Sequence, residues 1–219
     1  MTHTYAAYKR PTSKEDLHRL KVKGWKQIFQ ANGQEKIKAG VAILIADKID
    51  FKKRAIKRDP ESHFIILKGR IHQEDINIVN IYAPNIGVPK YIENILEDFK
   101  KDIDSNRIIV GDFNTPMPKM DRSFKQNINK DIAALNNALD EMDFTDTYIA
   151  FHPKEAKYTF FSNAHGTFSN IDHMIEHKTN LNKFSKIEII SSIFSDHGTG
   201  TRNQPQRKKP KILKLIGIE

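Results

Sequence analysis

The chain has 219 residues, a length typical of one domain or at most two, and its 29% charged and 38% hydrophobic residues are ordinary for a globular protein. Lys and Arg number 36 against 27 Asp and Glu, and the formal net charge of +9 favours a polyanionic partner, nucleic acid before an anionic lipid surface. Cysteine is absent, which excludes disulfides and thiolate metal sites, so any metal must be held by oxygen or imidazole ligands.

Residues 1–15 are polar and show no hydrophobic periodicity, and they predict a disordered lead-in. They contain no apolar run of the kind found in a secretory leader. The longest near-apolar stretch, residues 40–46, is too short to span a bilayer. The sequence therefore predicts a protein that has no membrane attachment, is not secreted, and lies in the nucleus or the cytoplasm.

Short strand-like runs come after the lead-in. The continuous apolar run at residues 41–45 is typical of a strand covered on both faces. Residues 63–67 and 76–82 predict two further strands, and residues 69–75 between them predict a hairpin loop.

Two later segments carry apolar residues every three to four positions and predict helices. These positions are Tyr91, Ile92, Ile95, Leu96, Phe99 and Ile103 in the first segment, and Ala134, Leu135, Ala138, Leu139 and Met142 in the second. Strands are predicted at residues 107–110 between the helices, and at 158–161, 170–175 and 186–190 after them. Many short strands with a few flanking helices predict an α/β fold of two packed sheets with the helices outside.

Residues 198–219 begin as a small, polar segment and include the charge run Arg207-Lys208-Lys209-Pro210-Lys211. Such a run predicts a flexible, solvated basic tail. A nuclear-import or phosphate-binding patch is the alternative.

The sequence Gly111-Asp112-Phe113-Asn114 directly follows the strand predicted at residues 107–110. Asp112 and Asn114 are two residues apart, so in extended backbone their side chains point to the same side. A carboxylate beside a carboxamide at the end of a strand can hold a hard cation together with a phosphate oxygen. The alternative is an Asx turn that closes the strand.

Two further groups combine a carboxylate with an imidazole. Asp172 precedes His173 in an apolar strand, where a carboxylate must be paired or ligating because burying it alone is costly; an ion pair on an edge strand is the alternative. Asp196 and His197 are adjacent, so in a strand they face opposite ways and cannot pair with each other. Asp172 is therefore the natural partner for His197, fixing its tautomer and raising its basicity, while a turn with a solvated histidine is the alternative.

The order Gly-Asp-Phe-Asn, Ile-Asp-His and Ser-Asp-His resembles the endonuclease/exonuclease/phosphatase superfamily, which includes DNase I. Five further stretches look like the endonuclease domain of mammalian LINE retrotransposons, namely residues 16–25, 30–33, 39–44, 80–85 and 158–162. The resemblance runs from about Asp16 to His197. It implies a DNase I-like, four-layer α/β sandwich over residues 16–197.

The resemblance also implies a role for each matching residue. Tyr82 matches the tyrosine that contacts the scissile phosphate, and Asp112 with Asn114 matches the pair that aligns the nucleophile and binds the phosphate. Asp172 matches the carboxylate that orients the catalytic imidazole of His197. The implied metal ligands are Asp196 and Asp112, and the implied DNA contacts are Thr159, Ser169 and Arg122.

The reaction implied by the family is hydrolysis of a DNA phosphodiester by a monomer, with Mg²⁺ as the cofactor and Mn²⁺ as the alternative. The chain departs from the family pattern at both ends. Residues 1–15 lack the strand with the family's asparagine and the Gln-Glu-Thr-His motif whose glutamate ligates magnesium, and no apolar closing strand is predicted after His197. We therefore expect a domain truncated at its N-terminus and lacking its closing strand. This leaves two alternatives open: a catalytically inactive nucleic-acid-binding remnant, and a phosphatase of small phosphate esters.

Overall fold

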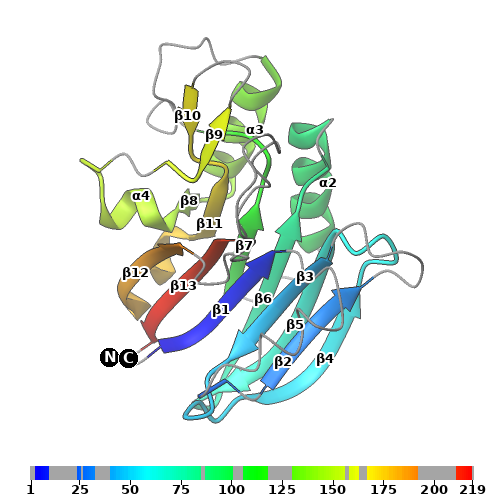
Figure 1. Cartoon of the computed structure of the whole chain (residues 1–219), viewed down its shortest axis with the longest axis vertical. Coiled ribbons are helices and arrows are strands. Elements are labelled where there is room, and N and C mark those ends of the chain that lie inside the picture. The colour runs from blue at the N-terminus through cyan, green and yellow to red at the C-terminus, as the bar shows by residue number, and fades with distance from the viewer. Residues whose placement is uncertain are drawn as a thin grey trace, which may run out of the picture.

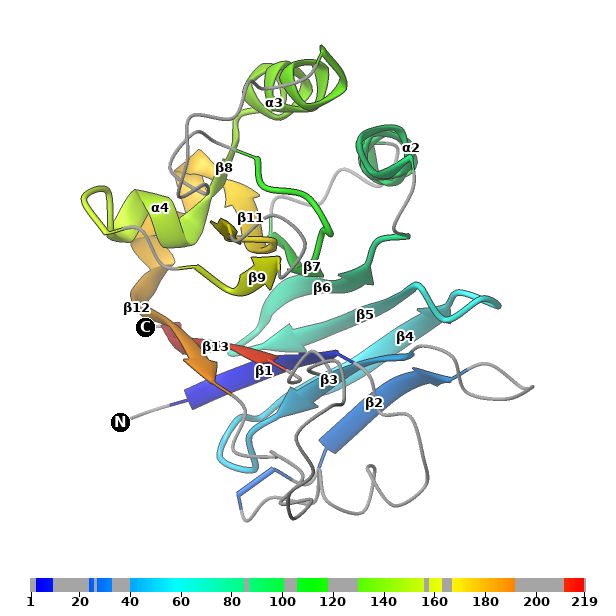
Figure 2. The same ribbon diagram turned by 45° about the horizontal axis from the view of Figure 1, so that its top comes forward.

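The computed structural model describes residues 3–9, 24–25, 27–32, 40–84, 87–100, 106–117, 130–155, 158–162, 167–191 and 211–218. In these residues two β-sheets pack face to face, and helices α2 and α3 lie over the outer face of one of them (Figure 1, Figure 2). The α/β class predicted from the sequence is confirmed. Of the four layers expected for the sandwich, the described residues form three. None of their helices is long and apolar enough to cross a membrane.

The larger sheet has six strands in the order β4-β5-β6-β7-β11-β8. They are β4 (Lys52–Arg58), β5 (Phe64–Ile71), β6 (Glu74–Tyr82), β7 (Arg107–Asp112), β11 (Asp172–His177) and β8 (Phe144–Asp146). β6 and β7 are parallel, with helix α2 (Val88–Lys100) between them in the chain, and the other neighbours are antiparallel. β4 has mostly basic, exposed residues and was not predicted, because a strand at the edge of a sheet needs no apolar pattern.

The β5–β6 hairpin turns at His72 and Gln73, whose φ angles are 48° and 69°. Positive φ at both central residues is characteristic of a two-residue type I′ turn. The hairpin predicted from the sequence is therefore present, but with a much shorter loop than residues 69–75.

The smaller sheet has five antiparallel strands in the order β12-β13-β1-β3-β2. They are β1 (His3–Lys9), β2 (Gln27–Asn32), β3 (Gly40–Ile45), β12 (Phe184–Ser191) and β13 (Lys211–Ile218). The remaining elements are helices α3 (Lys130–Glu141) and α4 (Thr147–Phe151), the 3-10 helix η2 (Lys178–Lys183), and a hairpin of β9 (Phe160–Ser162) with β10 (Thr167–Ser169).

Strands β1 and β13 correct two expectations about the ends of the chain. Residues 3–9 were expected in a disordered lead-in, and residues 211–218 in a flexible tail without a closing strand; both predictions are wrong. β13 pairs with β12 on one side and β1 on the other, and β1 also pairs with β3. After Lys211 the segment is mostly Ile and Leu, but the charge run before it dominated the composition of the tail. Pairing between strands some 200 residues apart leaves no local pattern to detect.

Two apolar cores lie on either side of the six-stranded sheet. Alternation along β5 divides them, because successive side chains of a strand point to opposite faces. Ile65 and Leu67 pack towards β3 between the two sheets, and Ile66 packs towards α2 and α3. The two sheets are also joined by a buried hydrogen bond, in which Asn80 Nδ2 donates to the Ala42 carbonyl over 2.8 Å.

Candidate active site

Three of the residues singled out by the sequence lie side by side at one edge of the six-stranded sheet. Tyr82 ends β6 and Asp112 ends β7, and they are register partners in the parallel pair. Asp172 begins the antiparallel strand β11 and is the register partner of Asp112 on the other side. Cross-strand partners project from the same face, so the phenol and two carboxylates form one row. Asp112 is 1% exposed, whereas Asp172 is partly exposed.

The turn after β7 fixes Asn114 beside Asp112. The Asn114 backbone N–H donates to Asp112 Oδ1 over 2.7 Å, and the Asn114 carboxamide donates to the Ala83 carbonyl. Ala83 N–H in turn donates to the Asp112 carbonyl over 2.8 Å. The Asx turn, which the sequence left open as the alternative, is therefore present. It also keeps the half-buried Asn114 next to the row, so the turn and the candidate site are one structure.

Gly111 has a structural role that the motif alone did not reveal. Its φ is 142°, and a Cβ built at this position would lie 2.0 Å from the Ile81 carbonyl oxygen. Only glycine allows β6 and β7 to approach this closely. The contact between these two strands is what brings the ends at Tyr82 and Asp112 together.

Thr159, which was expected to contact DNA, is 6% exposed, and its hydroxyl faces the protein. It donates to Asn170 Oδ1 over 3.0 Å and accepts from the backbone N–H groups of Ile171 and Asp172 over 3.0 and 3.3 Å. The Thr159 backbone N–H donates to the Ser169 carbonyl over 3.0 Å. Thr159 thus holds the start of β11, where Asp172 lies. A DNA contact by Thr159, and one by the partly exposed Ser169, remain predictions.

Thr159→Val should lower the free energy of unfolding by about 1–3 kcal/mol, because valine removes the acceptor of the Ile171 and Asp172 N–H groups and the hydroxyl that donates to Asn170. Urea denaturation followed by circular dichroism measures the change. Thr179→Val is the matched control, since the hydrogen bond between the Thr179 hydroxyl and His177 is exposed. Equal effects of the two substitutions would contradict the role assigned to Thr159.

His173 is fully buried and belongs to the scaffold of the site. Its Nδ1 lies 2.8 Å from Asp146 Oδ2, and its Nε2 lies 3.0 Å from the Thr115 carbonyl oxygen. Both ring nitrogens therefore face acceptors, and the ring meets Phe113 edge-on with centroids 5.4 Å apart. Asp146 also caps helix α4, because its Oδ1 accepts from the N–H of Tyr148 over 2.9 Å. His173 thus ties the turn after β7 to β11 and α4.

His63 is a second imidazole near the row, and no sequence motif marks it. Its carbonyl accepts the Tyr82 N–H over 2.6 Å, and its ring centroid lies 6.5 Å from that of Tyr82. Its Nδ1 is 3.7 Å from Asp59 Oδ2 and 3.5 Å from Glu61 Oε2. Burial, with the negative charges of Asp59 and Glu61, raises the pKa of the neighbouring Tyr91, so that phenol stays neutral. His63 lies in a turn and belongs to no sequence motif, so the sequence around it does not indicate that it lies near Tyr82.

The described residues contain a donor set that fits magnesium in part. Asp112 and Asp172 are adjacent carboxylates with Asn114 beside them, and Mg²⁺ typically uses one or two carboxylates and completes its shell with water and substrate phosphate. No group of three or more His, Cys, Asp or Glu side chains suited to a metal occurs in the described part of the chain. Arg122, Asp196 and His197 lie outside the described residues.

Comparison with known proteins shows which family and which solved structures the chain resembles. A sequence profile of the Endonuclease/Exonuclease/phosphatase family matches residues 5–197. Among solved structures, the chain is similar to the catalytic domain of Xenopus laevis APE2, with 14% identity, a TM-score of 0.70, and coverage of 98% of this chain and 84% of that chain. It is also similar to the 3′ phosphatase NExo from Neisseria, bound to a product DNA hairpin, with 14% identity, a TM-score of 0.66 and coverage of 96% and 87%.

A third similar structure is the endonuclease domain of TRAS1, a telomere-specific non-LTR retrotransposon. Identity is 13%, the TM-score is 0.61, and the match covers 89% of this chain and 81% of that chain. At these identities the likeness establishes a shared fold. The chain covers most of the length of all three structures.

Proposed function

The chain belongs to the endonuclease/exonuclease/phosphatase family, and from this membership we propose that it hydrolyses DNA phosphodiester bonds with magnesium, as an endonuclease of the LINE retrotransposon type. The observation that carries the proposal is the row of Tyr82, Asp112 and Asp172 across three neighbouring strands. The similar structures include DNA-processing enzymes and a retrotransposon endonuclease, which supports DNA as the substrate.

Each residue of the row has a chemical task in this proposal. The Tyr82 hydroxyl donates a hydrogen bond to a non-bridging oxygen of the scissile phosphate. Asp112 orients the attacking water and accepts its proton, with the Asn114 carboxamide holding the phosphate beside it. Asp112 and Asp196 would hold magnesium, with Mn²⁺ as an alternative, and the charge of the ion would stabilise the negative charge that develops on the phosphate oxygens. His197, with Asp172 as its orienting carboxylate, completes the proposed set.

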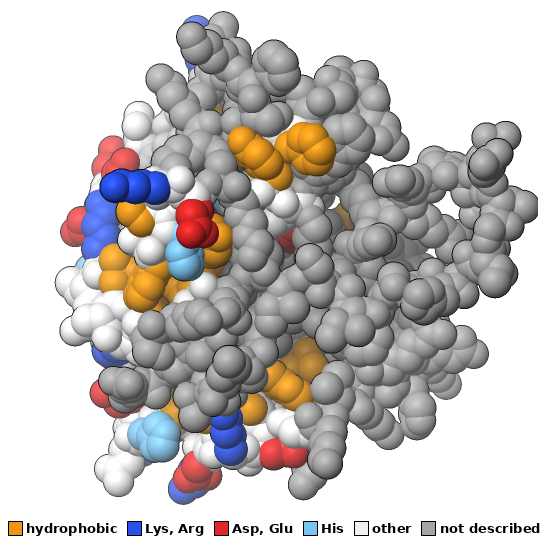
Figure 3. Space-filling view, turned by 60° about the vertical axis from the view of Figure 1, so that its left-hand side comes forward, with side chains coloured by type: hydrophobic (Ala, Val, Ile, Leu, Met, Phe, Trp, Pro, Cys, Tyr) orange, Lys and Arg blue, Asp and Glu red, His pale blue; other side chains and the backbone are white. Residues whose placement is uncertain are grey.

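An exposed pair of aromatic rings next to the row also supports a nucleic-acid substrate. Tyr158 and Phe168 are 37% and 48% exposed, and their ring centroids lie 6.0 Å apart at an interplanar angle of 31°. They flank Thr159 and Ser169, next to the strand that begins with Asp172. Exposed rings of this kind can stack on nucleic-acid bases. Figure 3 shows one face of the molecule, on which apolar side chains (orange) lie beside charged ones.

Incubation with supercoiled plasmid and Mg²⁺ tests the proposal. We expect conversion to the open-circular form, and none when EDTA replaces Mg²⁺. A small phosphomonoester is offered in parallel, and release of inorganic phosphate without nicking would replace the proposal with a phosphatase. Plasmid that is bound in a gel-shift assay but never nicked would identify the inactive nucleic-acid-binding alternative.

The basic segment before β13 should contribute to DNA affinity through phosphate contacts. Removing residues 202–219 would also remove β13 from the five-stranded sheet, so substitution is the better test. Changing Arg207, Lys208 and Lys209 to Gln should make the slope of log K against log salt less negative, by up to about 3, since each phosphate contact contributes about −0.9. Fluorescence anisotropy over a salt series measures the slope.

The matched control is the double substitution of Lys52 and Lys53 to Gln. These exposed residues begin β4 opposite Arg70 and Gly69, at the end of the sheet away from Tyr82. The control should leave the slope unchanged. An unchanged slope in the triple variant would mean that the basic segment does not contact DNA.

A further inference from the structure

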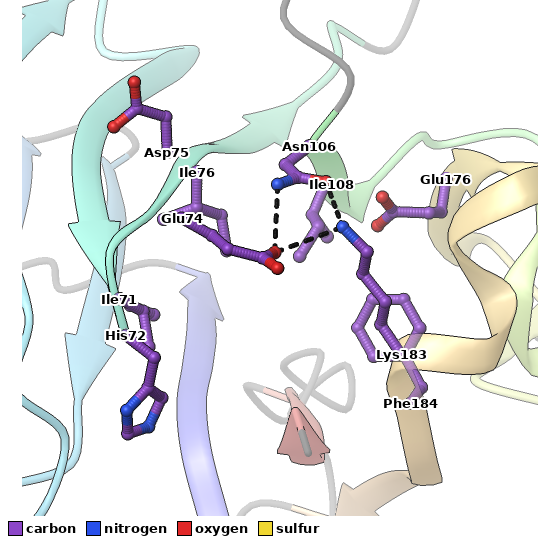
Figure 4. A pocket seen from close by; sticks show the side chains of 10 residues that line it. All are labelled: Ile71, His72, Glu74, Asp75, Ile76, Asn106, Ile108, Glu176, Lys183 and Phe184. Carbon is purple, nitrogen blue, oxygen red and sulfur yellow. Dashed lines mark hydrogen bonds and ion pairs between the residues drawn. The ribbon is translucent and has the colours of Figure 1, made fainter.

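A cavity of about 140 Å³ lies at the opposite edge of the six-stranded sheet from the row of Tyr82, Asp112 and Asp172. It sits where β5 ends, β6 and β7 begin, and η2 leads into β12 (Figure 4). Its apolar wall is formed by Ile71, Ile76, Ile108 and Phe184. Nothing in the proposed hydrolysis uses this end of the sheet.

Glu176 is a buried carboxyl group at this cavity. Its residue is 1% exposed, and Oε1 accepts from Asn180 Nδ2 over 3.0 Å. Oε2 has no hydrogen-bond partner among the residues that the structure describes. Figure 4 shows the carboxyl group directed towards the space beside Lys183 and Asn106. A buried carboxylate oxygen without a donor is costly, so a ligand that supplies one gains free energy on binding.

The other charged groups of the lining already have partners. Lys183 Nζ donates to Glu74 Oε2 over 3.2 Å and to Asn106 Oδ1 over 2.5 Å. Asp75 lies 2.7 Å from Arg54 Nη1 and 2.9 Å from Arg70 Nε. Because these groups are paired, the carboxylate of Glu176 is the charged group of the lining with which a ligand would interact. The lining is acidic, although the net charge of the protein is +9. A cation fits it better than an anion.

We propose that this cavity binds a primary ammonium group carried on a short alkyl chain. The ammonium group donates to Glu176 Oε2, and the alkyl chain packs against Ile108 and Phe184. The ligand thus supplies both the missing donor and the missing charge, and its apolar part is removed from water. The proposal is independent of the hydrolytic function and stands if that function fails.

Binding of such a ligand is coupled to the protonation of Glu176. Burial raises the pKa of Glu176 well above its ordinary value, partly offset by the Asn180 hydrogen bond and the charge of Lys183. The charged or titratable groups that also line the cavity are Glu74 and Asp75 from β6, His72 from the β5–β6 turn and Lys183 from η2. At pH values below the pKa of Glu176 its carboxyl group carries a proton, and this proton must be released when the ammonium group binds. Affinity should therefore rise about tenfold per pH unit up to the pKa of Glu176 and level off above it.

Isothermal titration calorimetry with n-butylammonium chloride tests the proposal on the full chain. We expect one saturable site, proton release on binding, and no saturable heat with n-butanol or sodium chloride. Glu176→Gln keeps the shape and the Asn180 hydrogen bond but removes the charge, and it should lower the affinity at least tenfold and abolish the pH dependence. His72→Gln is the control and should preserve both.

Lys183→Met provides a second test that does not touch the buried carboxyl. It removes a like charge and releases Glu74, so at pH values above the pKa of Glu176 the affinity for n-butylammonium should increase several-fold. Below that pKa the gain is offset, because the loss of Lys183 also raises the pKa of Glu176. The pH series on the unmodified chain needs no variant at all. The proposal would be overturned by an absence of saturable binding or by equal binding of n-butanol. It would also be overturned by an affinity that falls as pH rises, because a protonated Glu176 would then be donating to the ligand.

Discussion

Gly111→Ala is expected to destabilise the protein by about 3 kcal/mol or more, a large part of the roughly 5–15 kcal/mol that stabilises an ordinary domain. The new Cβ would lie 2.0 Å from the Ile81 carbonyl oxygen, in backbone with a φ of 142° that alanine rarely adopts. Relief of this overlap requires β6 and β7 to separate, which breaks the parallel pairing that aligns Tyr82 with Asp112. Urea denaturation monitored by circular dichroism gives the change in the free energy of unfolding.

Gly87→Ala is the matched control for this substitution. Gly87 also has a positive φ, 71°, but no atom lies within 4 Å of a Cβ placed there. Its replacement should therefore cost only the backbone strain, about 1–2 kcal/mol. If the two alanine variants are equally stable, close approach of the strands is not what requires glycine at position 111.

Asp112→Asn is expected to reduce plasmid nicking by about 10²-fold or more, because the carboxylate that accepts the proton of the attacking water is lost. The fold should survive, since asparagine retains the Oδ1 that accepts the Asn114 N–H. DNA affinity should be unchanged or higher, because a negative charge near the phosphate has been removed. Nicking rates with Mg²⁺ and anisotropy titrations on the same preparations separate catalysis from binding.

Asp75→Asn is the control for this loss of activity. Asp75 is a partly exposed carboxylate bonded to Arg54 and Arg70, at the end of β6 away from Tyr82. Arg70 and Arg54 hold the pKa of Asp75 below its ordinary value, so Asp75 is ionised in the working pH range. The control should nick at the rate of the unmodified chain. Equal losses in both variants, or full activity of Asp112→Asn, would remove Asp112 from the proposed mechanism.

The sequence by itself determined the elements whose pattern is local. The apolar run at residues 41–45 lies in β3, and residues 107–110 form most of β7. Of the two periodic segments, residues 91–99 lie in α2 and residues 134–139 lie in α3, whereas Met142 follows the end of α3 and Ile103 lies outside the described residues. The placement of Asp112 and Asn114 next to each other was also predictable, because side chains two residues apart in extended backbone point to the same side. These features depend on hydrophobic periodicity and on spacing over a few residues, which a single sequence contains.

Only the tertiary structure decided how distant segments meet. The register that brings Asp112 beside Tyr82 and Asp172 joins residues 30 and 60 positions apart, and no local pattern encodes it. The same holds for β1 and β13, which pair with each other from opposite ends of the chain, and for Thr159, whose hydroxyl turns inwards to hold the start of β11. The cavity at Glu176 likewise depends on where five strands and a 3-10 helix come together. Such contacts are set by strand pairing and by the requirement that buried polar groups find partners, and both become visible only when the chain is folded.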